Sequence, residues 1–156
     1  MLWQLSPSDI FWCGTGENRQ GTGRIYPAKQ PFTTEKTADN TLIIDAYNAN
    51  PTSMMASISN FRNMQAENKM LILGDMRELG KDSADEHQKI ADYLEECGFK
   101  DVVLVGELFA ATRHPYQSYP DVTALIAELQ REKPCGKTIL IKGSNGIKLS
   151  STVEYL

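Results

Sequence analysis

Four short apolar runs, each ended by a polar residue or a glycine, constrain the fold of this chain more than any other feature. The runs cover residues 42–44, 70–73, 102–105 and 138–141. Apart from Thr138, each run is continuously apolar instead of alternating with polar residues, which is typical of strands buried on both faces. Such strands occur mainly in parallel sheets that helices cover on both sides. The four runs therefore predict the centre of a parallel sheet.

Helical patterns occupy the gaps between these runs. One pattern follows Asn50-Pro51, where asparagine suits a helix cap and proline suits the first turn. A second begins at a capping box in residues 83–86 and stops at Gly98. A third begins after Asp121, and a last helix is expected over residues 144–155. Strands therefore alternate with helices along the chain.

This alternation predicts an α/β fold, a Rossmann-like three-layer sandwich with a mostly parallel sheet. Residues 116–119 are expected to add a short edge strand. Residues 1–40 contain glycine and proline without a sustained period, so we expect an irregular leader or a domain-junction remnant there. The glycine-rich stretch 14–23 lacks the lysine of a phosphate-binding loop and is interpreted as a flexible loop. The folded domain is expected to cover residues 41–156.

The composition narrows the classes of function. The 16 lysines and arginines stand against 20 acidic residues, a formal net charge of −4, which argues against a nucleic-acid-binding surface. No apolar run approaches the roughly 20 residues of a membrane-spanning helix. The three cysteines are widely spaced, form no metal-binding or redox motif, and are typical of a reduced protein. We therefore expect a cytoplasmic protein that handles small molecules, without nucleic-acid or membrane partners.

The segment from Asp45 to Pro51 places a carboxylate, a tyrosine and two asparagines directly after a predicted strand. A carboxylate accepts hydrogen bonds from sugar hydroxyls, tyrosine stacks and donates, and asparagine suits an adenine edge or a ribose hydroxyl. The alternative is turn chemistry, and for Asn50 a helix-cap role is the better explanation. For Asp45, Tyr47 and Asn48 the binding role is favoured.

The segment from Gly74 to Gly80 carries Asp75 and Arg77 in a predicted loop. Together they suit a zwitterionic ligand, because aspartate can meet an ammonium group and arginine can bind a carboxylate through two hydrogen bonds. The alternative is a surface ion pair involving Arg77, which would contribute little. On spacing alone the two interpretations are equal.

A third segment, Lys142-Gly143-Ser144, has the composition of an anion site at a helix start. The alternative is that Ser144 only caps the last helix, and both roles can hold together. In parallel sheets, ligand-binding residues gather at the carboxyl ends of the strands. We therefore expect Asp45, Asp75 and Lys142 to lie along one edge of the sheet.

These three segments, in this order, resemble the Mur ligase family. The family pattern is Asp-x-Tyr-Asn-Ala-Asn-Pro, then Gly-Asp-Met-x-Glu-Leu-Gly, then Lys-Gly-Ser, and here these are residues 45–51, 74–80 and 142–144. The resemblance covers about three quarters of the chain, from Thr41 onward. It is closest to the branch that adds D-alanyl-D-alanine to UDP-N-acetylmuramoyl-tripeptide.

The resemblance implies the C-terminal, substrate-closing domain of an ATP-dependent amide-forming ligase in peptidoglycan synthesis. Family members have a central ATPase domain whose phosphate-binding loop and magnesium ligands are not in this sequence. This chain is therefore expected to share ATP with that domain, to bind no Mg²⁺ itself, and to be inactive alone. The implied partners are UDP-muramoyl peptide and D-alanyl-D-alanine, and the implied state is a monomer.

The resemblance also assigns roles to single residues, with no catalytic residue and no metal ligand among them. Two groups are implied. The adenosine side comprises Asp45, Tyr47, Asn48 and, in a more structural role, Asn50; the dipeptide side comprises Asp75, Arg77 and Glu78, with Lys142 and Ser144 lining the same cleft.

Two other classes of function compete with the ligase domain. A stand-alone nucleotide- or amino-acid-binding module with a Rossmann-like cleft would need the same loops but no partner domain. A dehydrogenase-type cofactor domain would need a glycine fingerprint after the first strand. Residues 45–48 contain no glycine, so the dehydrogenase hypothesis ranks last.

Overall fold

The computed structural model describes residues 33–45, 49–77 and 79–156. Six strands in these ranges form one sheet in the order β1-β2-β6-β3-β4-β5. β1 pairs with β2 in antiparallel orientation, and all the other neighbouring strands are parallel. The mostly parallel sheet predicted from the apolar runs is therefore confirmed. The strands are β1 Thr33–Lys36, β2 Thr41–Asp45, β3 Lys69–Gly74, β4 Val102–Val105, β5 Gln117–Tyr119 and β6 Thr138–Lys142.

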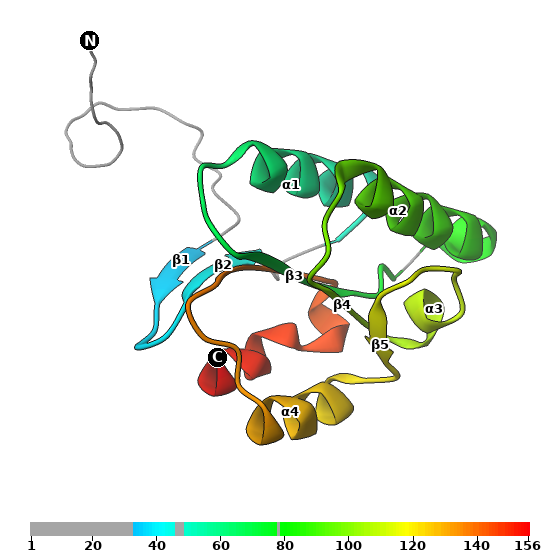
Figure 1. The fold of residues 1–156 in the computed structure, drawn as a ribbon. Helices are drawn as coiled ribbons and strands as arrows, with labels where there is room; N and C mark the ends of the chain where they lie inside the picture. Colours follow the sequence, from blue (N-terminus) through cyan, green and yellow to red (C-terminus); the bar gives the residue numbers. More distant parts are fainter. Residues whose placement is uncertain (1–32, 46–48, 78) are drawn as a thin grey trace, which may run out of the picture. The chain divides into compact units, whose positions relative to one another are not determined.

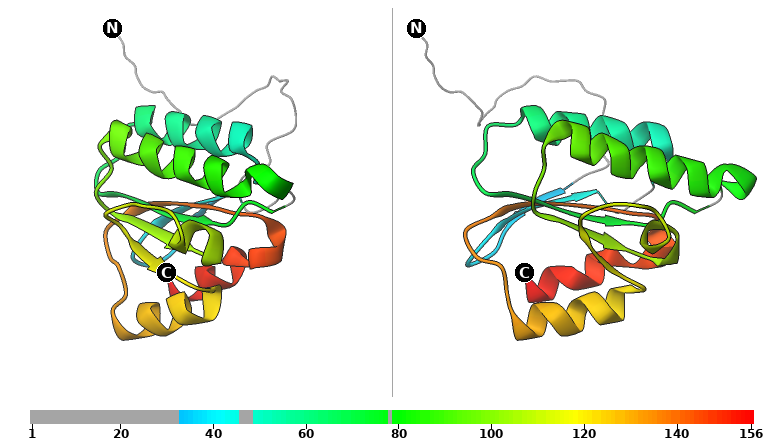
Figure 2. Two further views of the ribbon diagram at one scale, coloured as in Figure 1. Left: turned by 90° about the vertical axis from the view of Figure 1, so that its right-hand side faces the viewer. Right: turned by 45° about the vertical axis from the view of Figure 1, so that its right-hand side comes forward.

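Helices cover both faces of the sheet and complete the predicted three layers. α1 (Pro51–Asn63) and α2 (Ser83–Cys97) lie side by side over one face (Figures 1 and 2). α4 (Val122–Arg131) and the 3-10 helix η5 (Leu149–Tyr155) lie over the other. The short α3 (Glu107–Ala110) follows β4 at the edge of the sheet where the parallel strands end. No helix in the described ranges is long and apolar enough to cross a membrane.

The strands are apolar on both faces because helices pack against both. Successive side chains of a strand point to opposite faces. In β3, Leu71 and Leu73 therefore pack with side chains of α1 and α2, whereas Ile72 packs with α4 and η5. In β6, Leu140 belongs to the first cluster and Ile141 to the second. This two-sided burial accounts for the continuous apolar runs.

The predicted helix boundaries are partly confirmed. The Asn50 side chain accepts a hydrogen bond from Ser53 N–H at 2.8 Å and caps α1. Asp121 caps α4, and Gly98 ends α2 in the left-handed conformation. The capping box expected at residues 83–86 is wrong, because the 3-10 helix η3 (Gly80–Asp82) leads directly into α2.

Two segments differ from the predictions. The last helix is not α-helical: it consists of the 3-10 helices η4 (Asn145–Ile147) and η5, separated by Lys148 in the left-handed conformation. β1 falls within the 40 residues for which an irregular leader was expected, so that expectation is wrong for residues 33–36. Its four exposed polar side chains carry no apolar pattern, which is why the strand was missed. The remainder of the expected leader, residues 1–32, lies outside the described residues.

Buried Asn40 joins three segments at the amino ends of the strands. Its Nδ2 donates to Pro134 O at 2.9 Å and to the main-chain oxygen of Leu156 at 2.6 Å. Its Oδ1 accepts from Lys137 N–H at 3.1 Å. The side chain therefore ties the entry to β2 to the entry to β6 and to residue 156.

Replacing Asn40 with alanine is expected to lower the free energy of unfolding by about 2 kcal/mol, because buried partners lose their hydrogen bonds. Urea denaturation followed by circular dichroism measures the change. Asn60→Ala is the matched control, since Asn60 is exposed on α1. Equal denaturation midpoints for the two variants would contradict the role given to Asn40.

Candidate functional site

The three predicted motifs meet at the carboxyl edge of the parallel strands. β6 lies between β2 and β3, so Lys142 is in register with Asp45 on one side and with Leu73 on the other. The loops that follow β3 and β6 are joined by a hydrogen bond from Ser144 N–H to Asp75 O at 3.3 Å. The prediction that Asp45, Asp75 and Lys142 lie along one edge of the sheet is confirmed.

Asp45 and Lys142 form a buried ion pair at this edge. The Lys142 Nζ to Asp45 Oδ2 distance is 2.7 Å, and the two side chains are only 2% and 7% exposed, respectively. Ser57 on α1 donates a further hydrogen bond to the same carboxylate oxygen at 2.9 Å. The Asp45 carboxylate thus links β2, β6 and α1, and a ligand hydroxyl at Asp45 would share it with these two donors.

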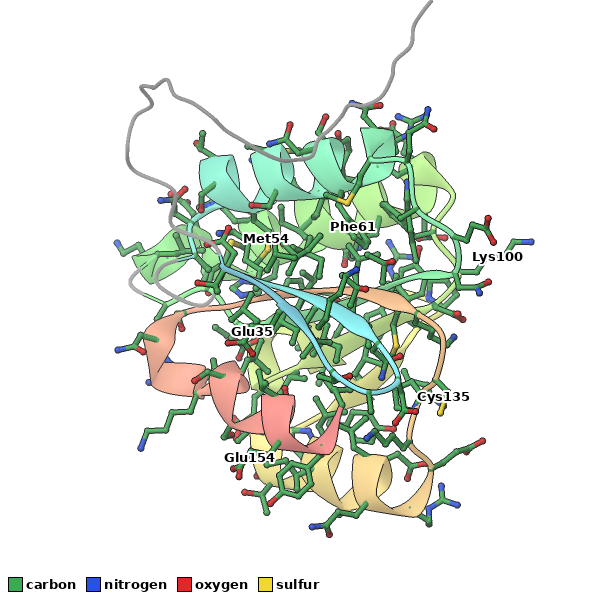
Figure 3. The ribbon with its side chains drawn as sticks, turned by 90° about the vertical axis from the view of Figure 1, so that its left-hand side faces the viewer. Glu35, Met54, Phe61, Lys100, Cys135 and Glu154 are labelled. Atoms are coloured by element: carbon green, nitrogen blue, oxygen red, sulfur yellow. The ribbon has the colours of Figure 1, made fainter. Side chains whose placement is uncertain are left out.

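A pocket of about 290 Å³ lies between α1 and the strands β2 and β6, with Asp45 and Ser57 among its lining residues. The rest of its lining is largely apolar and includes Ile43, Phe61 and Leu140. Figure 3 shows this side of the molecule, with the Phe61 side chain directed from α1 toward the sheet. Asp45, whose contact with adenosine remains a prediction, therefore borders a cavity with mainly apolar walls.

Asp75 has a structural role that the sequence did not predict. Its Oδ1 accepts from Phe109 N–H at 2.9 Å, and its Oδ2 accepts from Leu108 N–H at 3.0 Å. The carboxylate therefore caps α3, a helix of four residues that is too short to show a periodic apolar pattern. Its contact with an incoming dipeptide remains a prediction.

Arg77 is exposed and lies against the loop that follows β6. Its Cδ, Nε and Nη1 atoms are 3.4 Å from the position that a Cβ on Gly146 would occupy. Within the described residues Arg77 forms no ion pair, so the alternative role of Arg77 in a surface ion pair is not found there. The exposed Arg77 side chain thus extends from the second motif to the loop that follows the third.

Ser144 makes no side-chain hydrogen bond at the start of η4, so the alternative role as a side-chain cap is not found. Its Oγ is buried, and within the described residues it has no hydrogen-bond partner. Its neighbour Gly143 explains the tight packing here, because a Cβ at that position would come within 3.0 Å of Gly74 Cα. A buried hydroxyl without a hydrogen-bond partner costs free energy. A ligand that pairs with Ser144 Oγ would remove this cost, so Ser144 is a candidate ligand-binding residue.

His87 is fully buried, although Glu86 and Lys89 beside it in the sequence are typical of a solvated helix face. It shares one face of α2 with Ile90, Ala91 and Leu94, at helical spacing. Its Nε2 accepts from Met76 N–H at 2.9 Å, within the second motif. The spacing to Ile90 and Leu94 was the signal that would have placed it in the core.

For four other predicted site residues, the contact with a ligand remains a prediction. The Asn50 side chain is engaged in the cap of α1, and its contact with a nucleotide remains a prediction. Tyr47, Asn48 and Glu78 lie outside the described residues.

Comparison with known proteins identifies the family to which this chain belongs. The family model described as Mur ligase, glutamate ligase domain, matches residues 32–145 of this chain. The chain belongs to the Mur ligase family. The match begins one residue before β1, so the family domain includes the antiparallel edge strand.

Named relatives are similar to this Mur ligase domain over part of their length. The UDP-N-acetylmuramoyl-tripeptide–D-alanyl-D-alanine ligase of Rickettsia prowazekii is 36% identical over 123 residues, 73% of this chain and 27% of the relative. The corresponding Escherichia coli ligase is 29% identical over 154 residues, 95% of this chain and 32% of the relative. The chain therefore spans about a third or less of the length of these relatives.

A solved structure supports the same assignment of the fold. A crystal structure of MurF from Acinetobacter baumannii superposes with a TM-score of 0.64 at 27% identity, covering 83% of this chain and 30% of that one. The fold and the family of this chain thus agree with the resemblance found in the three motifs.

Proposed function

We propose that this Mur ligase domain closes over the substrates of a ligase that adds D-alanyl-D-alanine to UDP-N-acetylmuramoyl-tripeptide. The observation that carries the proposal is the convergence of the three motif loops at one edge of the sheet. The Asp45–Lys142 ion pair joins the first and third loops, and the Ser144–Asp75 hydrogen bond joins the third and second. The names of the relatives supply the reaction.

Two side chains of this edge, the exposed Arg77 and the buried Ser144, suit the incoming dipeptide. The Arg77 guanidinium can bind the dipeptide carboxylate through two hydrogen bonds. The Ser144 hydroxyl, which has no partner among the described residues, can pair with a polar group of the same ligand. Their task is to hold the dipeptide amine in position and to exclude water as the domain closes.

The nucleotide would bind on the Asp45 side of the edge, where Tyr47, Asn48 and Asn50 remain predicted contacts. The cavity beside Asp45 supports this placement, because its mainly apolar walls can receive an apolar ring next to a carboxylate. When bound, ATP activates the carboxylate of the tripeptide. We assign no magnesium ligand to this chain, and we propose that it works as a monomer in the cytoplasm, without nucleic-acid or membrane partners.

A chimeric ligase tests this function. Residues 33–156 replace the C-terminal domain of the Rickettsia prowazekii relative, and D-alanyl-D-alanine-dependent phosphate release is measured together with product formation. We expect the chimera to be active and Arg77→Ala to raise the KM for the dipeptide by at least about tenfold, as befits a lost charged hydrogen bond. Arg62→Ala, exposed near the end of α1, is the matched control and should leave the KM unchanged.

The 156-residue chain alone is expected to show no turnover in the same assay. Its one Gly-Lys-Thr triplet, residues 136–138, leads into β6 at the opposite edge, where Lys137 pairs with Asp101 at 2.6 Å. Micromolar binding of D-alanyl-D-alanine by this chain alone would instead favour a stand-alone binding module. A chimera that hydrolyses ATP equally with and without the dipeptide would refute the proposed function.

A further inference from the structure

His87 occupies a buried position directly behind the second motif. Its Nε2 accepts from Met76 N–H at 2.9 Å, and its Nδ1 lies 2.6 Å from Ser83 O. The ring packs edge-on against Phe109, with ring centroids 4.7 Å apart. Phe109 N–H in turn donates to the Asp75 carboxylate. The His87 ring therefore contacts both Met76, which follows Asp75 in the chain, and Phe109, which binds the Asp75 side chain.

The partners of His87 determine its tautomer. Ser83 O is a carbonyl oxygen and can only accept, so Nδ1 must carry the hydrogen. Met76 N–H can only donate, so Nε2 must present its lone pair. Both ring nitrogens are therefore satisfied in the neutral Nδ1–H form. The nearest acid, Asp75, is 3.9 Å from Nε2 and is already engaged by two main-chain N–H groups of α3.

Met76 connects the two functional residues of the loop. It follows Asp75, whose carboxylate is held at α3, and it precedes Arg77, which is exposed. The Met76 side chain is fully buried, and its amide is bonded to His87. The main chain is thus held at Asp75 and at the Met76 amide, and the Arg77 side chain that follows lies against Gly146.

We propose that His87 is a positioning residue that sets Arg77 against the loop after β6, ready for the carboxylate of the incoming dipeptide. This inference rests on the proposed function. What the position requires is an acceptor at Nε2, not only the bulk of a ring. A leucine would fill much of the space but would leave Met76 N–H buried without a partner.

Two substitutions separate the acceptor from the rest of the side chain. Glutamine at position 87 can place its carbonyl oxygen near the position of Nε2 and so keep the bond to Met76. Asparagine is polar but shorter: it can approach Ser83 O and does not reach Met76. His87→Gln therefore retains the positioning contact, and His87→Asn removes it.

The first test is nuclear magnetic resonance of the ¹⁵N-labelled 156-residue chain. We expect a protonated Nδ1, an unprotonated Nε2, and a scalar coupling across the hydrogen bond between His87 Nε2 and the Met76 nitrogen. In His87→Asn the Met76 amide should exchange faster with solvent and the Arg77 signals should shift, whereas His87→Gln should resemble the wild type. An Nε2–H tautomer, or unchanged Arg77 signals in His87→Asn, would overturn the proposal.

The second test is steady-state kinetics in the chimeric ligase. We expect His87→Asn to raise the KM for D-alanyl-D-alanine by about tenfold, the scale of one lost hydrogen bond, with little change in the KM for ATP. His87→Gln should restore the dipeptide KM. Equal rises in both KM values, or equal effects of the two variants, would indicate a merely structural role. An inactive wild-type chimera would refute the proposed function, while the magnetic resonance result would still decide whether His87 positions Arg77.

Discussion

Replacing Lys142 with methionine is expected to lower the free energy of unfolding by about 3–5 kcal/mol, because the Asp45 carboxylate is left buried without its cation. Methionine keeps much of the length of the side chain, so the effect reports mainly the lost charge. The ion pair is almost completely removed from solvent, and Ser57 alone cannot compensate the carboxylate. Chemical denaturation measures the loss.

Two further variants complete the test of this ion pair. Combining Lys142→Met with Asp45→Asn removes both charges, and most of the lost stability should return. Lys137→Ala breaks the exposed pair with Asp101 and should change the free energy of unfolding by less than about 1 kcal/mol. If Lys142→Met and Lys137→Ala lose equal stability, the buried pair does not have the role assigned to it.

Replacing Gly106 with alanine is expected to lower the free energy of unfolding by about 4 kcal/mol, from two separate effects. Gly106 has φ +122° and ψ 158°, a conformation that costs other residues about 2 kcal/mol. A Cβ there would also collide with the Asp75 carboxylate. Moving that carboxylate away from the two N–H groups of α3 adds about 2 kcal/mol.

Gly98→Ala is the matched control for this prediction. Gly98 also has positive φ, at +79°, but no atom lies within 4 Å of its missing Cβ. Only the backbone penalty of about 1 kcal/mol is therefore expected. Thermal unfolding measures both variants, and amide exchange at Leu108 and Phe109 reports the lost cap. Similar stability losses in the two variants would mean that Asp75 does not depend on Gly106.

These contacts give the carboxyl edge of the sheet two kinds of polar side chain. Asp45, Asp75 and His87 are buried and hold the loops in place through hydrogen bonds and an ion pair. Arg77 is exposed, and the buried Ser144 Oγ has no partner in the described part of the chain. The first kind shapes the edge, and the second kind is available for a ligand.

Much of the fold could be predicted from local patterns. The apolar runs predicted β2, β3, β4 and β6, because strands covered on both faces are apolar throughout. Asn50 and Asp121 were recognised as caps, since capping involves residues three positions apart. β1 was missed because its residues are polar and exposed, and its pairing depends on the neighbouring strand.

The candidate site was predicted less completely. The three motifs were expected to meet, because parallel strands end at a common edge. Their hydrogen-bond partners were not predicted. The sequence did not predict that the Asp75 carboxylate caps α3, which follows a different strand, and its contact with a ligand remains a prediction. His87 lies among charged residues in the sequence, yet it is buried and its ring accepts a hydrogen bond from Met76.

The sequence by itself therefore determined the layered α/β fold, the order of the motifs and the edge at which they meet. Each of these follows from apolar patterns and from the direction of parallel strands, which are properties of neighbouring residues. Only the tertiary structure decided which polar side chains hold the loops and which remain available. Such partners lie 33 or 34 positions apart in the case of Asp75, and 97 positions apart for Asp45 and Lys142. Contacts at that separation depend on how loops from different strands pack together, and no local pattern in the chain specifies them.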